Sequence, residues 1–565
     1  MPMRGSMLGG VSLALVAAFL GVFLVAPLVI AVWAGLDARA LTEVFANPVY
    51  RSGIVNALTI ASVTTVIALA LTVPLAWFGA RHRFRGKGLA EALLLAPLIL
   101  PPFVGALGVY QILGQYGVLN TLLESLGLYA VGRGPDWLGD HRFAVVCAVE
   151  ALGLYPVLYL LLNAAFAKID PSLLEASRGL GASRFTTFRR VVLPLVRPGL
   201  FGGAVIVFVW SFTELGTPLM LGYDRVTPVQ VFAAMADIGS NRLPYALVVV
   251  MLAIAMALYA LSRLLFARRY DALAAKGAGA GGMDSAAKRL SGWRAAAAWL
   301  PYLALCLLAM LPHLAVLLTG MSRDWYHTVL PHGFSLIHVN EALSNENVVP
   351  GIVNSVTYAT AATVLGMIVG TFIAWTCVRW RPAGWQAFDI AAMVPLAVPG
   401  IIFAFGYIGL AYASPLLRSW LDPFRNPTAL LIIAYAIRRL PHVVRAASAG
   451  LSQAPEVFEE AAASLGANRW TRLRRITLPL IAGSLAAGAL MTFSFSMLEV
   501  SDSLILAQKR EFWPITRVIY DLVNVLGSGP AIACAFAAWA MLFLTATLAA
   551  AAVFLGRNPS SLFRD

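Results

Sequence analysis

The stretch LLEASRGLGASRFTTFRRVVLP, residues 173–194, returns in altered form as FEEAAASLGANRWTRLRRITLP at residues 458–479. Both copies are rich in arginine, and both hold a glutamate, a glycine and a final Leu-Pro pair in the same register. They stand in a chain of 565 residues, of which 60% are hydrophobic and only 12% are charged. A loop that needed only positive charge would not keep this register twice, so the two stretches predict a chain built from two equivalent halves.

The rest of the sequence consists mainly of apolar runs of about 20 residues, the length that crosses the hydrocarbon core of a bilayer as a helix. Such long uncharged runs differ from the short alternating strands of a membrane barrel. The first run is too long for a cleavable signal peptide, and no small-residue cleavage site follows it. We therefore predict an all-α polytopic membrane protein with twelve spans near 9–34, 54–80, 88–113, 143–167, 198–222, 243–267, 297–320, 352–378, 386–411, 427–447, 482–507 and 530–555.

Further matches extend the repeat over both halves. GIVNALTIASVTT from Gly53 matches GIVNSVTYATAAT from Gly351, 298 residues later, and after the third span the separation drops to 285. Because each half holds six spans, the halves share one orientation and are related by a pseudo-twofold axis along the membrane normal. The expected regions are an N-terminal helix and external loop (1–50), a first repeat (51–267), a flexible Gly/Ala-rich cytoplasmic linker (268–296), a helix and external loop (297–349) and a second repeat (350–556).

The formal net charge of +14 is explained by orientation in a membrane. With the N-terminus in the cytoplasm, most Lys and Arg fall in cytoplasmic segments, as the positive-inside rule requires, and the C-terminus is cytoplasmic too. These residues favour contact with anionic membrane lipid, and no nucleic-acid partner is expected. The cysteines lie in predicted spans without ligand spacing and are interpreted as buried apolar side chains: Cys147, Cys306, Cys377 and Cys534.

Each repeated stretch is predicted to form a short helix, a break and a second short helix. Pro171 and Pro455 stand near the start of the first helix, where proline is tolerated. Gly181 and Gly466 are suited to a left-handed turn that ends it. The basic amphipathic piece that follows suits docking into the groove of a partner or lying on the membrane.

The pattern E-A-A-x3-G-x9-I-x-L-P resembles the EAA loop of permease subunits in binding-protein-dependent ABC importers of the type I fold. The second copy matches it completely, whereas the first departs at Ser177 and Val191. The resemblance covers about residues 50–265 and 350–555 and is strongest to fused permeases for ferric iron and thiamine. It implies two fused type-1 permease domains whose loops couple to ATPase subunits through Glu175, Ala176, Gly181 and Pro194 in the first copy and Glu460, Ala461, Ala462, Gly466 and Pro479 in the second.

The resemblance also implies the partners and the location of the protein. We expect two copies of an ABC ATPase on the cytoplasmic side, a periplasmic solute-binding protein outside, and residence in a bacterial inner membrane. ATP would be bound by the ATPase partner, because the chain contains no G-x4-G-K-[ST] phosphate loop. Neither a cofactor nor a catalytic residue is expected in this chain, which is interpreted as a transport subunit and not as an enzyme.

Four ionisable residues inside predicted spans are candidates for the translocation pathway, since a charge within a bilayer is costly. Glu214 and Glu499 occupy matching positions in the fifth span of each half, where they could face each other across the central axis. Arg438 and Arg439 lie in the tenth span and match uncharged residues of the first half. The structural alternative is that these residues form buried salt bridges, or that the arginines extend to the inner interface.

These observations predict the membrane-spanning permease of an ATP-driven importer, with ferric iron as its substrate. Thiamine, a polyamine, a phosphonate or another small solute are the alternatives, because facing carboxylates suit a hard cation whereas two arginines suit an anion or a chelate. The sequence does not specify metal ligands. An ion-coupled secondary transporter is the first rival class, but it gives no reason for the duplicated loops. A membrane-embedded enzyme is disfavoured because no catalytic motif is present.

Overall fold

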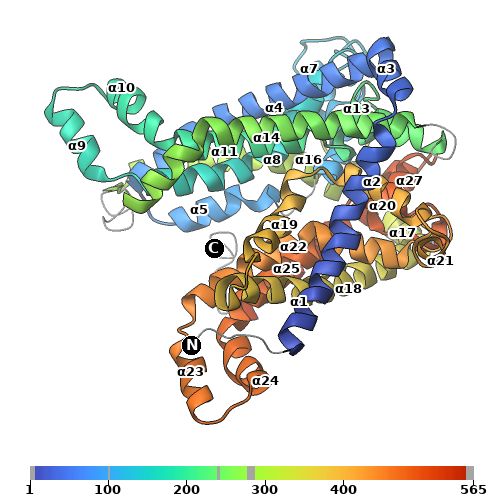
Figure 1. Ribbon diagram of the computed structural model, residues 1–565. Coiled ribbons are helices and arrows are strands. Elements are labelled where there is room, and N and C mark those ends of the chain that lie inside the picture. The colour runs from blue at the N-terminus through green and yellow to red at the C-terminus, as the bar shows by residue number, and fades with distance from the viewer. Residues whose placement is uncertain (1–6, 99–101, 238–241, 277–286, 555–565) are drawn as a thin grey trace.

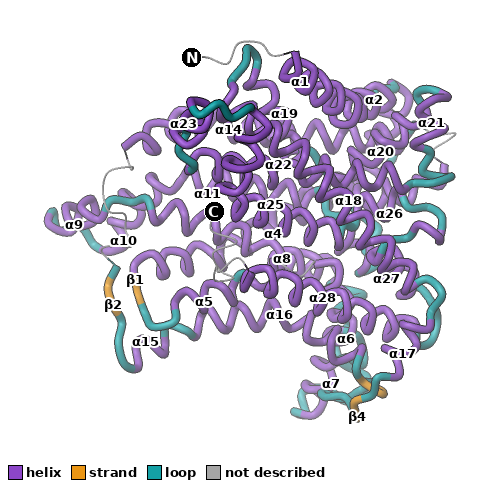
Figure 2. The backbone as a smooth tube through the Cα atoms, turned by 90° about the horizontal axis from the view of Figure 1, so that it is seen from below, coloured by secondary structure: helices purple, strands orange, loops and turns teal. Residues whose placement is uncertain are grey.

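The computed structural model describes residues 7–98, 102–237, 242–276 and 287–554, and helices dominate it (Figure 1). The short strands lie at the edges of the helical body (Figure 2). The first half contains α1 (Met7–Leu20), η1 (Gly21–Val25), α2 (Ala26–Gly35), α3 (Ala38–Ala46), α4 (Pro48–Arg81), β1 (His82–Arg83), α5 (Lys87–Leu94), η2 (Ala96–Leu98), α6 (Pro102–Leu113), α7 (Val118–Ser125), α8 (Arg142–Ala167), α9 (Pro171–Gly179), α10 (Arg184–Thr187), η3 (Phe188–Val192), α11 (Leu193–Phe212), α12 (Gly216–Met220), α13 (Thr227–Ala233), η4 (Ala234–Asp237) and α14 (Leu243–Lys276).

The second half follows the same order after a short connection. Its elements are β2 (Lys288–Arg289), α15 (Trp293–Ala297), α16 (Leu300–Gly320), β3 (Ser322–Asp324), β4 (Gly333–Phe334), α17 (Ile337–Ser344), α18 (Val348–Trp375), η5 (Thr376–Trp380), α19 (Trp385–Ala397), α20 (Gly400–Tyr412), α21 (Pro415–Leu421), α22 (Thr428–Gln453), α23 (Val457–Ser464), α24 (Arg469–Arg472), η6 (Leu473–Thr477), α25 (Leu478–Met497), α26 (Ser501–Leu506), η7 (Arg510–Phe512), α27 (Ile515–Val523) and α28 (Gly529–Phe554).

The helices confirm the prediction of a polytopic all-α membrane protein. Nine helices in the described part of the chain are long and apolar enough to cross a membrane, and two sharply bent helix pairs raise the number to eleven. α22 coincides with the tenth of the twelve predicted spans but falls outside this apolar set, because it carries Arg438, Arg439 and Arg445. It nevertheless packs between α18 and α25 inside the helical body.

The third and ninth predicted spans are bent. α19 and α20 meet at an angle of 110°. Val398, the residue before Pro399, takes an extended conformation with φ −100° and ψ 125°. The clash between a proline ring and the preceding residue disfavours the helical region there, so the helix ends and a new one begins at Gly400. The pair Lys87–Leu98 and Pro102–Ser125 forms the corresponding bent span of the first half.

The first spanning helix of each half packs against a helix of the other half. α2 packs on α20 of the second half, and α16 packs on α6 of the first, so that α2 lies over the second-half helices in Figure 1. Glycines permit these close contacts: a Cβ on Gly108 would overlap the Pro312 carbonyl, and a Cβ on Gly406 would overlap the Pro27 carbonyl. The glycines are 298 residues apart and the prolines 285, so one contact is repeated about the pseudo-twofold axis and interlocks the halves.

The expected flexible linker, 268–296, is only partly described, because residues 277–286 lie outside the described residues. α14 continues to Lys276, and β2 pairs in parallel with β1 at the end of α4. Trp299 adds to this contact by donating from Nε1 to the Arg85 carbonyl at 3.1 Å. The start of the second half is therefore bound to the first half by backbone pairing and by Trp299.

Candidate functional site: two projecting loops and a central cavity

The two repeated stretches form matching projections at the same end of the molecule (Figure 1). EAA loop 1 comprises residues 171–192, with α9 and α10, and EAA loop 2 comprises residues 456–477, with α23 and α24. Each loop therefore has the helix, break and short helix that the sequence predicts. Each continues through a five-residue π-helical turn, η3 or η6, into a long helix that begins at a Leu-Pro pair.

The breaks depend on two glycines with left-handed backbones. Gly181 has φ +78° and Gly466 has φ +83°, a region that only glycine enters without strain. Gly181 N–H donates to the Arg178 carbonyl at 2.9 Å, and Gly466 N–H donates to the Ala463 carbonyl at 3.0 Å. The residue after each glycine also donates back into the helix, so each helix ends in a closed turn that satisfies its last carbonyl groups.

Large apolar side chains at the tips of both loops face solvent. Leu180 and Leu465 occupy matching positions and are each 88% exposed, and Phe185 and Trp470 match at 72% and 66% exposed. Such exposure is unfavourable in water unless another molecule covers the side chains. Since the same pair of a leucine and an aromatic residue occurs on both loops, it indicates one kind of docking surface present twice.

The residues predicted from the EAA pattern all lie on these loops or at their bases. Exposed positions are Glu175, Ala176, Gly181, Glu460, Ala461, Gly466 and Pro479, and partly exposed positions are Pro194 and Ala462.

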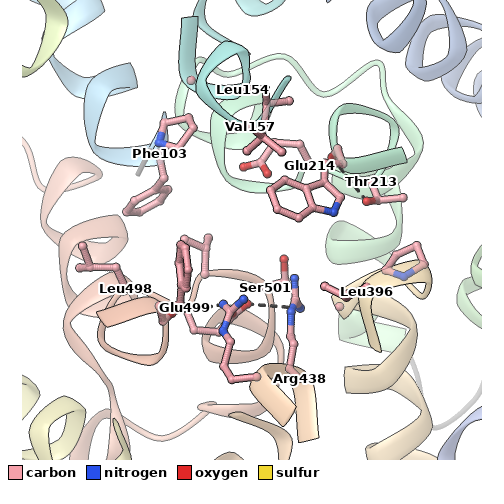
Figure 3. Close-up of a pocket in the computed structure, with 18 of the residues that line it drawn as sticks. Phe103, Leu154, Val157, Thr213, Glu214, Leu396, Arg438, Leu498, Glu499 and Ser501 are labelled. Carbon is pink, nitrogen blue, oxygen red and sulfur yellow. Dashed lines mark hydrogen bonds and ion pairs between the residues drawn. The ribbon is translucent and has the colours of Figure 1, made fainter. Parts of the chain in front are cut away.

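A cavity of about 240 Å³ lies between the two halves, with first-half residues on one wall and second-half residues on the other (Figure 3). Its lining repeats about the pseudo-twofold axis with the separation of 285 residues. The matching pairs are Gly153 and Arg438, Leu154 and Arg439, Val157 and His442, Val209 and Ser494, Trp210 and Phe495, Thr213 and Leu498, and Glu214 and Glu499. The cavity therefore lies on that axis.

The second-half wall is a cluster of four charged residues. Arg438 Nη1 lies 3.3 Å from Glu499 Oε1 and 3.6 Å from Asp502 Oδ2. Arg439 Nη2 donates to Glu499 Oε2. Both carboxylates are buried, and Glu499 lines the cavity together with the two arginines. Glu499 is thus paired with both guanidinium groups.

The first-half wall is different, although its positions match. Gly153 and Leu154 stand where the second half has its two arginines. Glu214 lies across the cavity from Arg438 (Figure 3) and is partly exposed to it. Its Oε1 accepts hydrogen bonds from the backbone N–H groups of Gly216 at 3.1 Å and Thr217 at 3.3 Å.

The fifth and eleventh spans, expected as continuous helices at 198–222 and 482–507, are each interrupted at the glutamate. α11 ends two residues before Glu214, and α25 ends two residues before Glu499. A helix that restarts leaves backbone N–H groups without carbonyl partners, and the Glu214 carboxylate accepts two of them. All four pathway candidates from the sequence line the same cavity, and their part in solute passage stays a prediction.

Three further residues contribute to the site without having been assigned to it from sequence. Asp502 completes the charged cluster, and a Cβ on Gly400 would overlap the Arg438 guanidinium. Glu150, buried in α8, accepts a hydrogen bond from Ser211. A charged residue inside an apolar run is a sequence signal that could have identified Asp502 and Glu150. Gly400 has no such signal in the sequence, apart from the proline that precedes it.

The described residues contain no cluster of three or more His, Cys, Asp or Glu side chains that could hold a metal ion.

The family model for binding-protein-dependent transport system inner membrane components matches the chain twice, at residues 72–272 and 348–553. A putative ferric transport system permease protein of Haemophilus influenzae is 26% identical over 474 residues, which are 82% of this chain and 70% of that protein. A ferric transport system permease protein of Actinobacillus pleuropneumoniae is 26% identical over 475 residues, 82% of this chain and 64% of that protein. A probable molybdenum ABC transporter permease protein of Haloferax volcanii is 31% identical over 244 residues, 42% of this chain and 85% of that protein.

The two matches to the family model fall on the two halves that the repeat defines, and each includes one EAA loop. The protein therefore belongs to the family of binding-protein-dependent transport system inner membrane components, and it is an ABC importer permease with two fused permease domains.

Proposed function

We propose that the chain forms the translocation path of a ferric iron importer in a bacterial inner membrane, with both termini in the cytoplasm. The observation that carries the proposal is the cavity on the pseudo-twofold axis, to which the carboxylate of Glu214 is open. Carboxylate oxygens are the ligands that hard cations favour. The similarity to two proteins named as ferric transport permeases supports the same substrate.

The proposed partners are two copies of an ABC ATPase and one periplasmic solute-binding protein. Each EAA loop presents the same exposed leucine and an exposed aromatic residue, so both loops suit the same ATPase surface. ATP would be bound and hydrolysed by these partners, and the chain itself would carry out no covalent chemistry. The binding protein would deliver the solute to the opposite end of the molecule.

The helix connectivity supplies a route from the loops to the cavity. α11 leads directly from EAA loop 1 to Glu214, and α25 leads from EAA loop 2 to Glu499. A 20-residue helix is about 30 Å long and moves as a stiff body. Closure of the two ATPases would therefore move both loops and, through these helices, the two walls of the cavity.

Uptake of ferric iron into proteoliposomes tests the proposal. The chain is reconstituted with an ABC ATPase and a solute-binding protein from the same organism, and radiolabelled ferric iron is supplied on the binding protein. ATP-dependent accumulation is expected, together with disulfide cross-linking of Leu180→Cys and Leu465→Cys to cysteines on the ATPase. A complex that hydrolyses ATP in response to the loaded binding protein but accumulates no iron would contradict the choice of substrate.

An oxyanion is the second candidate, because Arg438 and Arg439 line the cavity and a similar half-length protein is named as a molybdenum permease. The same proteoliposomes, supplied with molybdate in place of iron, separate the two. Accumulation of molybdate without accumulation of iron would replace the first proposal with this one.

A further inference from the structure

We infer that the two matching glutamates have different roles: Glu214 receives the cationic cargo in the cavity, and Glu499 holds the arginine pair in place. The inference rests on the proposed transport of a cation. It adds a division of labour between two residues that the repeat alone would treat as equivalent.

Glu499 is already occupied by partners within the chain. One carboxylate oxygen faces Arg438 at 3.3 Å and the other accepts a hydrogen bond from Arg439. The side chain is only 4% exposed. A cation would have to compete with two guanidinium groups for these oxygens, so Glu499 is poorly suited to hold a passing solute.

Glu214 is open to the cavity. It is partly exposed there, its hydrogen bonds come from two backbone N–H groups, and it forms no ion pair within the described part of the chain. Backbone N–H groups orient the carboxylate but carry no full charge. A carboxylate in a membrane interior is costly without a cation or water nearby, and the cavity gives access to both.

The charge balance of the two walls points the same way. Arg438 and Arg439 are compensated by Glu499 and Asp502, so the second-half cluster has no net formal charge. The first-half wall contributes Glu214, which has no arginine on its own wall and faces Arg438 across the cavity. Negative charge in a low-dielectric chamber raises the local concentration of cations.

The cavity, of about 240 Å³, has room for a small solute beside Glu214. The chemical class that we assign to the site is a small metal cation that binds to the open carboxylate of Glu214.

Four variants, assembled with the ATPase and binding protein in proteoliposomes, test the inference. Glu214→Gln is expected to lower the initial rate of ferric iron uptake about tenfold or more while complex yield and ATP hydrolysis are retained. Glu499→Gln is expected to lower the yield of assembled complex, because two guanidinium groups then share Asp502 alone.

Leu154→Arg places a guanidinium at the position that matches Arg439, where it should pair with Glu214 as Arg439 pairs with Glu499. This variant should lose uptake as strongly as Glu214→Gln. Leu154→Met changes shape without charge and should lose far less uptake. An equal loss in Leu154→Met and Leu154→Arg would show that shape, and not an open carboxylate, governs uptake.

Iron uptake by the unaltered complex tests the proposed function, and the comparison with the variants tests the inference. If the unaltered complex accumulates no iron, the proposed function fails before any variant is compared. If it accumulates iron and Glu214→Gln does so equally well, the inference is wrong and the proposed function stands. A loss of assembled complex in Glu214→Gln as large as in Glu499→Gln would also overturn it, because both glutamates would then be structural.

Discussion

Arg379 donates from Nη1 to Glu456 Oε1 at 2.8 Å and so ties EAA loop 2 to the end of the eighth membrane span. Its Nη2 also donates to the Leu451 carbonyl at 2.9 Å. The matching arginine of the first half, Arg81, lies over the Trp77 ring at 5.0 Å instead. The positions that match Glu456 and Glu459 hold apolar residues in the first half, Pro171 and Leu174. The two loops are therefore anchored by different means.

Arg379→Ala should loosen EAA loop 2 selectively. The change removes the ion pair and leaves backbone carbonyls without a donor, which costs about 1–3 kcal/mol of local stability. Hydrogen exchange in the assembled complex should speed up over residues 456–468 and stay unchanged over 171–183. Arg81→Ala is the matched control, since it removes a contact with an aromatic ring. Equal protection of both loops in Arg379→Ala would contradict the proposed anchor.

Replacing both loop glycines with a β-branched residue should uncouple transport. Nothing lies within 4 Å of an ideal Cβ at Gly181 or Gly466, so the effect of Gly181→Val/Gly466→Val comes from the left-handed backbone and not from crowding. The strain is about 1–2 kcal/mol per residue. ATP-dependent uptake should fall while the amount of chain in the membrane is unchanged. Asparagine tolerates this backbone region, so Gly181→Asn/Gly466→Asn should keep most of the uptake, and normal uptake in the valine pair would refute the turn requirement.

Much of this architecture can be predicted from the sequence because the same motifs occur in the same order in both halves. The register of Glu, Gly and Leu-Pro predicts both EAA loops, and the separation of 285 residues pairs Glu214 with Glu499 by alignment of the two halves alone. The interruption of the helices at these glutamates could not be predicted, since the surrounding residues are apolar enough to continue a span. The pairing of Arg438 with Asp502 depends on tertiary packing that no local pattern specifies.

The packing of each first spanning helix against the other half also could not be predicted from the sequence. This packing should contribute to the stability of the protein. Gly108→Ala and Gly406→Ala should each cost about 1–3 kcal/mol through overpacking, because the added methyl group would overlap a proline carbonyl. Gly202→Ala and Gly483→Ala are controls on open helix faces, with nothing within 4 Å. The melting temperature of the purified complex should fall in the first pair only. Equal melting temperatures in all four variants would show that the interlock is looser than described.

Accessibility labelling tests the orientation of the chain. The native cysteines are all buried, so a single introduced cysteine can be detected against a low background. Leu330 and Leu526 are 70% and 95% exposed at the end opposite the EAA loops, and Leu180 and Leu465 are exposed on the loops. Leu330→Cys and Leu526→Cys should react with a membrane-impermeant maleimide added to intact spheroplasts, whereas Leu180→Cys and Leu465→Cys should react only after permeabilisation. The reverse pattern would invert the proposed topology.

The charged cluster should behave as a coupled unit. In the unaltered chain Arg438 and Arg439 balance Glu499 and Asp502. Glu499→Gln leaves one excess positive charge, and Arg439→Leu leaves one excess negative charge, so each single variant should lose about 3–5 kcal/mol or a large share of folded complex. The double variant Arg439→Leu/Glu499→Gln restores neutrality, with Arg438 paired to Asp502, and places at 439 the residue that the first half has at Leu154. It should therefore be more stable than either single variant, which a double-mutant cycle on the melting temperature and yield of the complex would measure. If the double variant loses as much stability as the two single variants together, Arg439 and Glu499 act independently. The charged cluster would then not be a coupled unit.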